Sequence, residues 1–232
     1  MTGKTSPFFI PHDPQLAQPH SGPGSGLATQ EYPFFEGTVC CALQGNGQFY
    51  LLTCSHVMTR GSASNYGGYL QPGSGILPVI EQPVPTPLGT WAFAVFTNTL
   101  DVALVSLSPE QLGAIQPAAG FNQYRAVTEQ DKISQTAVTM LGFSTGMRNG
   151  FIVNYNATAS FSYNGQLVQM SQLIAISGVP GNNPQPVSQP GDSGAMIHDG
   201  AFALGMVIGS DQQFTYAIPM DAILNFLGMT IY

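Results

Sequence analysis

One serine in this 232-residue chain has the neighbours that a nucleophile needs. Ser193 follows Gly191-Asp192 and precedes Gly194, and an apolar run over residues 195–197 comes next. Flanking glycines permit a tight backbone turn and the close approach of another part of the chain. Such a turn presents the Ser193 hydroxyl and can aim the backbone N–H groups of Gly191 and Ser193 at one point. A nucleophile beside two such donors, an oxyanion hole, is suited to acyl transfer.

A base and an orienting acid come earlier in the chain. One apolar, strand-like run ends at His56, and Asp101 opens another. His56 and Asp101 are 45 residues apart, and Ser193 follows Asp101 after a further 92. A carboxylate at the start of so apolar a strand needs a hydrogen-bond donor, which the imidazole N–H can supply. The sequence therefore predicts a catalytic group of His56, Asp101 and Ser193.

These three segments resemble the motifs of the chymotrypsin/trypsin-like serine proteases. The segment 53–56, Thr-Cys-Ser-His, is similar to the family's Thr-Ala-Ala-His, and 101–104, Asp-Val-Ala-Leu, to its Asp-Ile-Ala-Leu. Gly-Asp-Ser-Gly at 191–194 is similar to its nucleophile motif. The order is also the family's, and the resemblance runs from about residue 33 to 228. It implies an endopeptidase that acts through an acyl-enzyme, with His56 as base and Asp101 as the group that orients it.

The resemblance implies an all-β fold of two six-stranded antiparallel β-barrels with a short C-terminal helix. The 27 glycines and 18 prolines suit many short strands joined by turns. We expect an extended N-terminal arm over residues 1–32, rich in Pro, Gly, Ser and Gln, and a first barrel over 33–115. A linker over 116–130 leads to the second barrel and terminal helix over 131–232. Base and nucleophile then come from different barrels, with the cleft between them.

Local patterns place several elements. Asn164-Gly165 predicts a hairpin turn, and Ser108-Pro109 predicts the start of a short helix. Gly228 predicts the end of a helix over residues 220–227. The glycines between residues 142 and 150 are similar to a strand-turn-strand of bacterial-type members of the family.

The resemblance also locates a specificity pocket. Its base lies six residues before the nucleophile, at Val187, its wall at Ile208-Gly209-Ser210, and Phe214 near its back. An apolar base favours an uncharged substrate side chain, because an unpaired buried charge costs several kcal/mol. We expect cleavage after a small or medium apolar residue, and Asp211 leaves a basic residue as the alternative.

The chain departs from the secreted members where the first barrel opens. In those proteins a freed Ile/Val N-terminus pairs with the aspartate before the nucleophile, here Asp192. No Ile-Val-Gly-Gly-like start occurs near Phe34, so we expect no zymogen cleavage. Either other groups hold Asp192, or an activating protein partner completes the oxyanion turn.

Composition limits the partners. The net charge is −7, and five Lys and Arg residues are too few to neutralise nucleic acid or an anionic membrane. No apolar run reaches the roughly 20 residues of a membrane span, and we find no signal-peptide pattern. The three cysteines, Cys40, Cys41 and Cys54, suggest reduced thiols, and no CxxC or HxxxH spacing indicates a metal. We expect a cytoplasmic enzyme without cofactor, acting on a protein or peptide.

Other functions remain open. Cys54 could be the nucleophile, and His198-Asp199 could be a local base pair. A catalytically weak, protease-fold interaction module would keep the barrels and show no reaction at Ser193. An esterase-type acyl hydrolase would use the same three residues and cleave only small esters.

Overall fold

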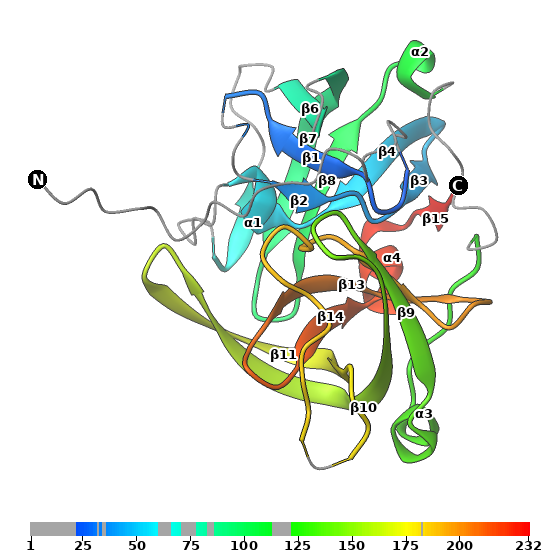
Figure 1. Ribbon diagram of the computed structural model, residues 1–232. Helices are drawn as coiled ribbons and strands as arrows, with labels where there is room; N and C mark the ends of the chain where they lie inside the picture. Colours follow the sequence, from blue (N-terminus) through cyan, green and yellow to red (C-terminus); the bar gives the residue numbers. More distant parts are fainter. Residues whose placement is uncertain are drawn as a thin grey trace, which may run out of the picture.

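The computed structural model describes residues 22–31, 33, 36–59, 66–70, 78–82, 86–112, 122–181 and 183–232. They form two β-rich halves, one above the other in Figure 1, with the C-terminal helix α4 between them. The all-β, two-barrel architecture predicted from the sequence is confirmed. No helix among these residues is both long and apolar enough to cross a bilayer.

The first half is an antiparallel sheet with the strand order β15-β3-β4-β8-β7-β6-β1-β2, and β5 pairs with β7. Its strands are β1 (Gly26–Thr29), β2 (Gly37–Thr38), β3 (Ala42–Gly45), β4 (Gln48–Thr53), β5 (Gly68–Leu70), β6 (Pro78–Gln82), β7 (Thr86–Phe96), β8 (Asp101–Ser106) and β15 (Thr230–Ile231).

Strands β2 and β3 follow each other directly in the chain but lie near opposite ends of the strand order. The sheet therefore closes into a barrel. The Cys40 N–H donates to the Leu52 carbonyl at 2.8 Å, and the Leu52 N–H donates to the Cys41 carbonyl at 2.9 Å. Six strand positions therefore enclose the core, and β5 and β15 add to its edges. The enclosed side chains are apolar and include Leu27, Leu51 and Val105, all fully buried.

The second half is a closed six-stranded barrel in the order β10-β11-β14-β13-β12-β9. Its strands are β9 (Ala137–Gly142), β10 (Gly146–Tyr163), β11 (Gln166–Ser177), β12 (Met196–His198), β13 (Ala203–Ser210) and β14 (Thr215–Pro219). The β10–β11 hairpin extends well beyond the barrel (Figure 1). Its turn is Asn164-Gly165, with φ of 48° and 84°, as the sequence predicted.

The helices are short: α1 (Ser55–Met58), α2 (Pro109–Leu112), α3 (Glu129–Ser134) and α4 (Met220–Leu227). The predicted start of α2 is confirmed, because Ser108 and Gln111 exchange side-chain to backbone hydrogen bonds of 3.3 and 2.8 Å. Gly228 ends α4 with φ of 64°, also as predicted. Helix α3 was not predicted, although Thr128 and Asp131 form a reciprocal capping box at its start.

The structure differs from the predicted arm at its C-terminal end. Residues 26–29 form β1, which pairs with both β2 and β6, and Leu27 and Ala28 are fully buried. So short an apolar segment carries little local signal, and distant partners determine its structure. Residues 1–21 of the predicted arm and 113–121, which include the start of the predicted linker, lie outside the described residues. The remaining domain boundaries stay predictions.

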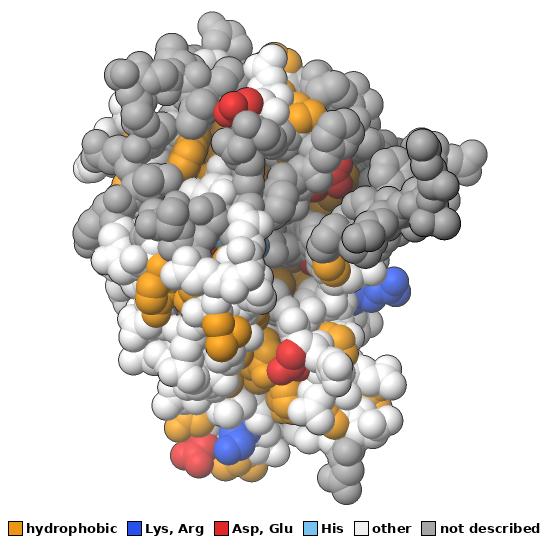
Figure 2. Space-filling model, turned by 90° about the vertical axis from the view of Figure 1, so that its left-hand side faces the viewer, with side chains coloured by type: hydrophobic (Ala, Val, Ile, Leu, Met, Phe, Trp, Pro, Cys, Tyr) orange, Lys and Arg blue, Asp and Glu red, His pale blue; other side chains and the backbone are white. Residues whose placement is uncertain are grey.

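The surface agrees with the low content of charged residues, which is 7% of the chain. Among the described residues on the face shown in Figure 2, uncharged side chains predominate and charged ones are few.

Candidate active site

His56 and Asp101 meet within the first half. His56 lies in α1, the helical turn directly after β4, and Asp101 opens β8. Strands β4 and β8 pair with Thr53 opposite Ala103, so the end of one lies beside the start of the other. The His56 backbone N–H donates to Asp101 Oδ1 at 2.9 Å, and ring Nδ1 is hydrogen-bonded to Asp101 Oδ2. One residue thus engages both carboxylate oxygens, which leaves Nε2 as the ring's remaining nitrogen.

The second half adds a residue that sequence reasoning missed. Tyr163, the last residue of β10, donates its hydroxyl to Asp101 Oδ2 at 3.4 Å, and its ring centroid lies 5.2 Å from that of His56. Burial, and then the charge of Asp101, raises the pKa of Tyr163 well above its usual value. The phenol therefore remains a neutral donor. Only the Asn-Gly turn after it hinted that this residue ends a strand.

The turn that carries Ser193 depends on its glycines. Gly191 and Gly194 have φ of 98° and 100°, in the left-handed region that favours glycine. A Cβ on Gly194 would lie 2.0 Å from the Thr38 carbonyl oxygen, which is part of the backbone and cannot move aside. Only glycine fits this contact between the two halves.

Thr38, in β2 of the first half, holds this turn. Its backbone N–H donates to the Ser193 carbonyl at 2.7 Å, and its hydroxyl donates to the Gly191 carbonyl at 2.8 Å. The same hydroxyl accepts the Phe143 N–H at 3.1 Å. The nucleophile turn is therefore fixed by a residue 153 positions away in the sequence.

Asp192 is held by backbone donors. Its Oδ1 accepts the N–H groups of Ser144 and Thr145 at 2.9 and 3.0 Å, and its Oδ2 accepts that of Gln189 at 2.9 Å. The residue is fully buried, and burial raises the pKa of its carboxyl although these hydrogen bonds lower it. Of the two outcomes expected for Asp192, the structure has the first: internal groups occupy both oxygens.

Two backbone N–H groups, those of Gly191 and Ser193, are expected to bind an oxyanion. Within the described ranges, neither the Gly191 N–H nor the Ser193 N–H donates a hydrogen bond. Both residues' carbonyls are instead held by Thr38. Both N–H groups of the turn are therefore without a described acceptor.

Ser193 and His56 line one cavity of about 470 Å³, but their side chains are not hydrogen-bonded to each other. The Ser193 hydroxyl instead donates to the Ile208 carbonyl at 3.5 Å, a long contact. The structure thus brings the three predicted catalytic residues together and leaves the serine–histidine contact open. Such contacts are often loose without substrate.

The predicted pocket residues divide into two groups. Ile208, Gly209 and Ser210 line the cavity, whereas Val187 and Phe214 do not. Val187 packs against the core of the second barrel, and Phe214 against the other core and the Tyr216 ring. The prediction for these two residues needs correction, because the family-based spacing fixes a position along the loop and not the direction of a side chain.

Two serine side chains, and not Val187, line this part of the cavity. Ser188 lines the cavity and shares a 2.8 Å hydrogen bond with the Thr215 hydroxyl. The Ser210 hydroxyl donates to the Ser188 carbonyl at 3.4 Å. Asp211 lies outside the lining and accepts hydrogen bonds from the Gln213 and Phe214 N–H groups and the Tyr216 hydroxyl. It therefore offers no counter-charge to a basic side chain in this cavity.

Cys54 and His198 are the alternative nucleophile and base. Cys54 is fully buried, burial raises the pKa of its thiol, and its Sγ donates to the Val207 carbonyl at 3.2 Å. Its sulfur lies within 4.8 Å of the ligand atoms of His56 and Asp101, but a thiol that retains its proton is a poor nucleophile and a poor metal ligand. His198 accepts the Gly200 N–H at 3.2 Å and does not line the cavity.

Comparison with known proteins supports the fold. No family model and no curated protein matches the sequence. Among solved structures, the chain is similar to Thermobifida fusca protease A, with a TM-score of 0.63 and 17% identity over 91% of this chain and 98% of that one.

Two further solved structures agree. Nocardiopsis protease gives a TM-score of 0.60 at 18% identity over 91% and 98% of the two chains. Cellulomonas bogoriensis chymotrypsin gives 0.59 at 19% over 92% and 98%. At these identities the likeness establishes a chymotrypsin-like fold.

Proposed function

From this chymotrypsin-like fold, we propose that the chain is a serine endopeptidase. The observation that carries the proposal is the double engagement of Asp101 by the backbone and ring of His56, at the edge of the cavity that Ser193 lines. A buried carboxylate with both oxygens on one histidine fixes the ring's tautomer and orientation. That arrangement has a direct use in general-base catalysis.

In the proposed mechanism, the Ser193 hydroxyl turns from the Ile208 carbonyl toward His56 Nε2. The oxygen attacks the substrate carbonyl carbon while Nε2 takes its proton, and Asp101 stabilises the imidazolium. Collapse of the tetrahedral intermediate breaks the C–N bond, and His56 gives the proton to the leaving amine. Water then cleaves the acyl-serine ester by the same steps, with His56 again as base.

The developing oxyanion would be bound by the N–H groups of Gly191 and Ser193. Neither donates a hydrogen bond to a described residue, and Thr38 and Asp192 fix the turn that presents them. A well-placed donor of this kind is worth roughly 10²–10³ in kcat.

The cavity supports a substrate with an uncharged side chain at the cleaved bond. Its lining combines apolar groups such as Phe161 and Ile208 with the hydroxyls of Ser188 and Ser210, and none of the described lining residues is Asp, Glu, Lys or Arg. We propose a small or medium apolar residue there. Profiling with a peptide library tests this point, and preferred cleavage after Arg, Lys or Glu would contradict it.

The expected location is supported by the cysteines. Cys40, Cys41 and Cys54 are free and fully buried. Reduced thiols suit the cytoplasm, which we propose as the compartment.

The deciding experiment compares the purified chain with Ser193→Ala on an unstructured protein and on small esters. The proposal predicts peptide-bond hydrolysis that the variant loses. Hydrolysis of esters alone would indicate the acyl-hydrolase alternative. No turnover in either protein, even with cell extract, would indicate an interaction module.

A further inference from the structure

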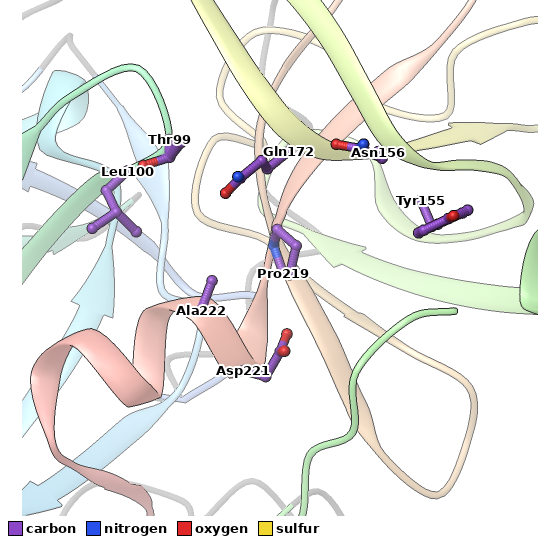
Figure 3. A pocket seen from close by; sticks show the side chains of 8 residues that line it. All are labelled: Thr99, Leu100, Tyr155, Asn156, Gln172, Pro219, Asp221 and Ala222. Atoms are coloured by element: carbon purple, nitrogen blue, oxygen red, sulfur yellow. The ribbon is translucent and has the colours of Figure 1, made fainter. Parts of the chain in front are cut away.

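A second cavity, of about 400 Å³, lies away from the proposed active site. Three elements surround it: the loop before β8, the bulged middle of the β10–β11 hairpin, and the start of α4 (Figure 3). The described residues that line it are all different from those that line the cavity of His56 and Ser193. Nothing in the proposed mechanism uses it.

One carboxylate in the cavity lining has an oxygen that accepts no hydrogen bond from the described residues. Asp221, in the first turn of α4, has a buried Oδ1 without a hydrogen-bond partner among the described residues. Proximity to a helix N-terminus favours its negative charge, but no N–H of the described residues donates to this oxygen. A buried acceptor without a donor is costly, so the site lacks a partner that donates hydrogen bonds.

The hairpin is deformed where it meets this cavity. The β10–β11 register shifts between Asn154 and Ala157, and Gln172 in β11 has a φ of 60°, which is strained for a residue other than glycine. Bulges redirect side chains and are frequent beside functional sites. Figure 3 shows the Gln172 side chain extending from the hairpin toward α4, while the Asp221 carboxylate points up from α4.

We propose that this cavity binds an organic cation, an ammonium or guanidinium group on a short aliphatic stem, with Asp221 as its counter-ion. The amide oxygens of Gln172 and Asn156 can accept further N–H groups, and Leu100 and Pro219 offer apolar surface to the stem. Asp221 is the one charged residue among the described lining, so the site favours cations. The net charge of −7 also attracts them.

Binding in this cavity would affect the loop that leads into Asp101. Leu100 lines the cavity and directly precedes Asp101, and its N–H donates to the Thr97 hydroxyl at 3.0 Å. In the same loop, the Asn98 carbonyl accepts a hydrogen bond from the Ser171 N–H at 2.8 Å. An occupant would therefore change kcat; this consequence alone rests on the proposed function, whereas binding does not.

The test is calorimetric titration of the intact chain with n-butylguanidinium, and with n-butanol as the neutral probe. We expect one saturable site of millimolar or tighter Kd for the cation and none for the alcohol. Asp221→Asn should weaken binding at least tenfold. Glu129→Gln removes the same charge from an exposed position in α3 and should leave binding unchanged. No saturable binding, or equal binding by Asp221→Asn, would overturn the proposal.

Two further arms sharpen the result. Gln172→Gly relieves the strained φ, so we expect a higher Tm together with weaker binding; tighter or unchanged binding would contradict the role of Gln172. The peptide acetyl-Gly-Arg-Gly-amide identifies the source of the cation. Binding at least tenfold tighter than that of n-butylguanidinium supports a basic protein segment, and equal binding supports a small free cation.

Discussion

The two halves of the molecule differ in how far their proposed catalytic groups are already positioned. In the first half, His56 and Asp101 are already joined by two hydrogen bonds, because the pairing of β4 with β8 places them side by side. In the second half, Ser193 sits on a fixed turn, but its hydroxyl contacts the Ile208 carbonyl instead of His56. The geometry of the His56–Asp101 pair follows from the strand register of one sheet, whereas the position of Ser193 depends on contacts between the halves.

Three carboxylates show a related contrast. Asp101 and Asp192 have both oxygens engaged by groups of the chain. Asp221 is only partly buried, and its buried Oδ1 has no hydrogen-bond partner among the described residues. The first two carboxylates stabilise a geometry, and the third indicates a missing partner.

The largest expected effect comes from removing either group of the proposed serine–histidine pair. Ser193→Ala and His56→Ala should each lower kcat by on the order of 10⁶, and the double variant should be no worse than either, because the groups act as a unit. Steady-state kinetics on the best peptide substrate measures this. Additive losses would show that the two halves do not meet in one reaction.

Asp101→Asn should cost less, about 10⁴ in kcat, since the amide leaves the geometry in place but favours the wrong imidazole tautomer. The thermal unfolding midpoint should be measured beside the kinetics, to separate catalysis from folding. A loss below about tenfold would mean that the pre-formed pair of the first half is not used in the reaction.

Thr38→Val tests the contact that links the halves. The variant keeps the shape of the side chain but removes the donor to the Gly191 carbonyl and the acceptor of the Phe143 N–H. We expect about 1–3 kcal/mol less stability and, from a less ordered oxyanion turn, about ten- to a hundredfold lower kcat. Thr139→Val, which removes an exposed hydroxyl bonded to Asn149, is the control. Equal effects of the two variants would contradict this role of Thr38.

The smallest effect should be confined to stability. Arg125 pairs with Asp131 at 2.8 Å and with Asp199 at 2.8 Å, and beside this guanidinium the pKa of the Asp131 carboxyl lies well below its usual value. A carboxyl whose pKa is lower in the folded state stabilises the fold above about pH 4, its value in the unfolded chain, and loses this contribution in acid.

Asp131→Asn should therefore cost about 1–3 kcal/mol in the free energy of unfolding at pH 7 and progressively less below pH 4, with kcat unchanged. Urea unfolding at pH 7, 5 and 3 measures the difference. A cost independent of pH would assign the effect to packing instead of charge.

The sequence predicted most of the fold and singled out three candidate catalytic residues, because their signals are local. Short motifs mark His56, Asp101 and Ser193, and turn chemistry marks the Asn164-Gly165 hairpin. The missed features join distant residues. Tyr163 meets Asp101 across 62 positions. Strand β1 depends on β2 and β6 for its structure.

The pocket shows a second limit. Spacing placed Val187 at the base of the expected pocket, but in this loop Ser188 lines the cavity and Val187 packs against the core. A motif fixes where the backbone runs. The direction of a side chain follows from packing that the motif does not contain.

The most direct test of the central claim is labelling of the intact chain by a fluorophosphonate, read by mass spectrometry beside Ser193→Ala. We expect one phosphonate on Ser193 of the native chain and none on the variant, which would show that the hydroxyl can turn to His56 within a working oxyanion site. A native chain that stays unlabelled, alone and with cell extract, would contradict the claim that the two halves form a catalytic site.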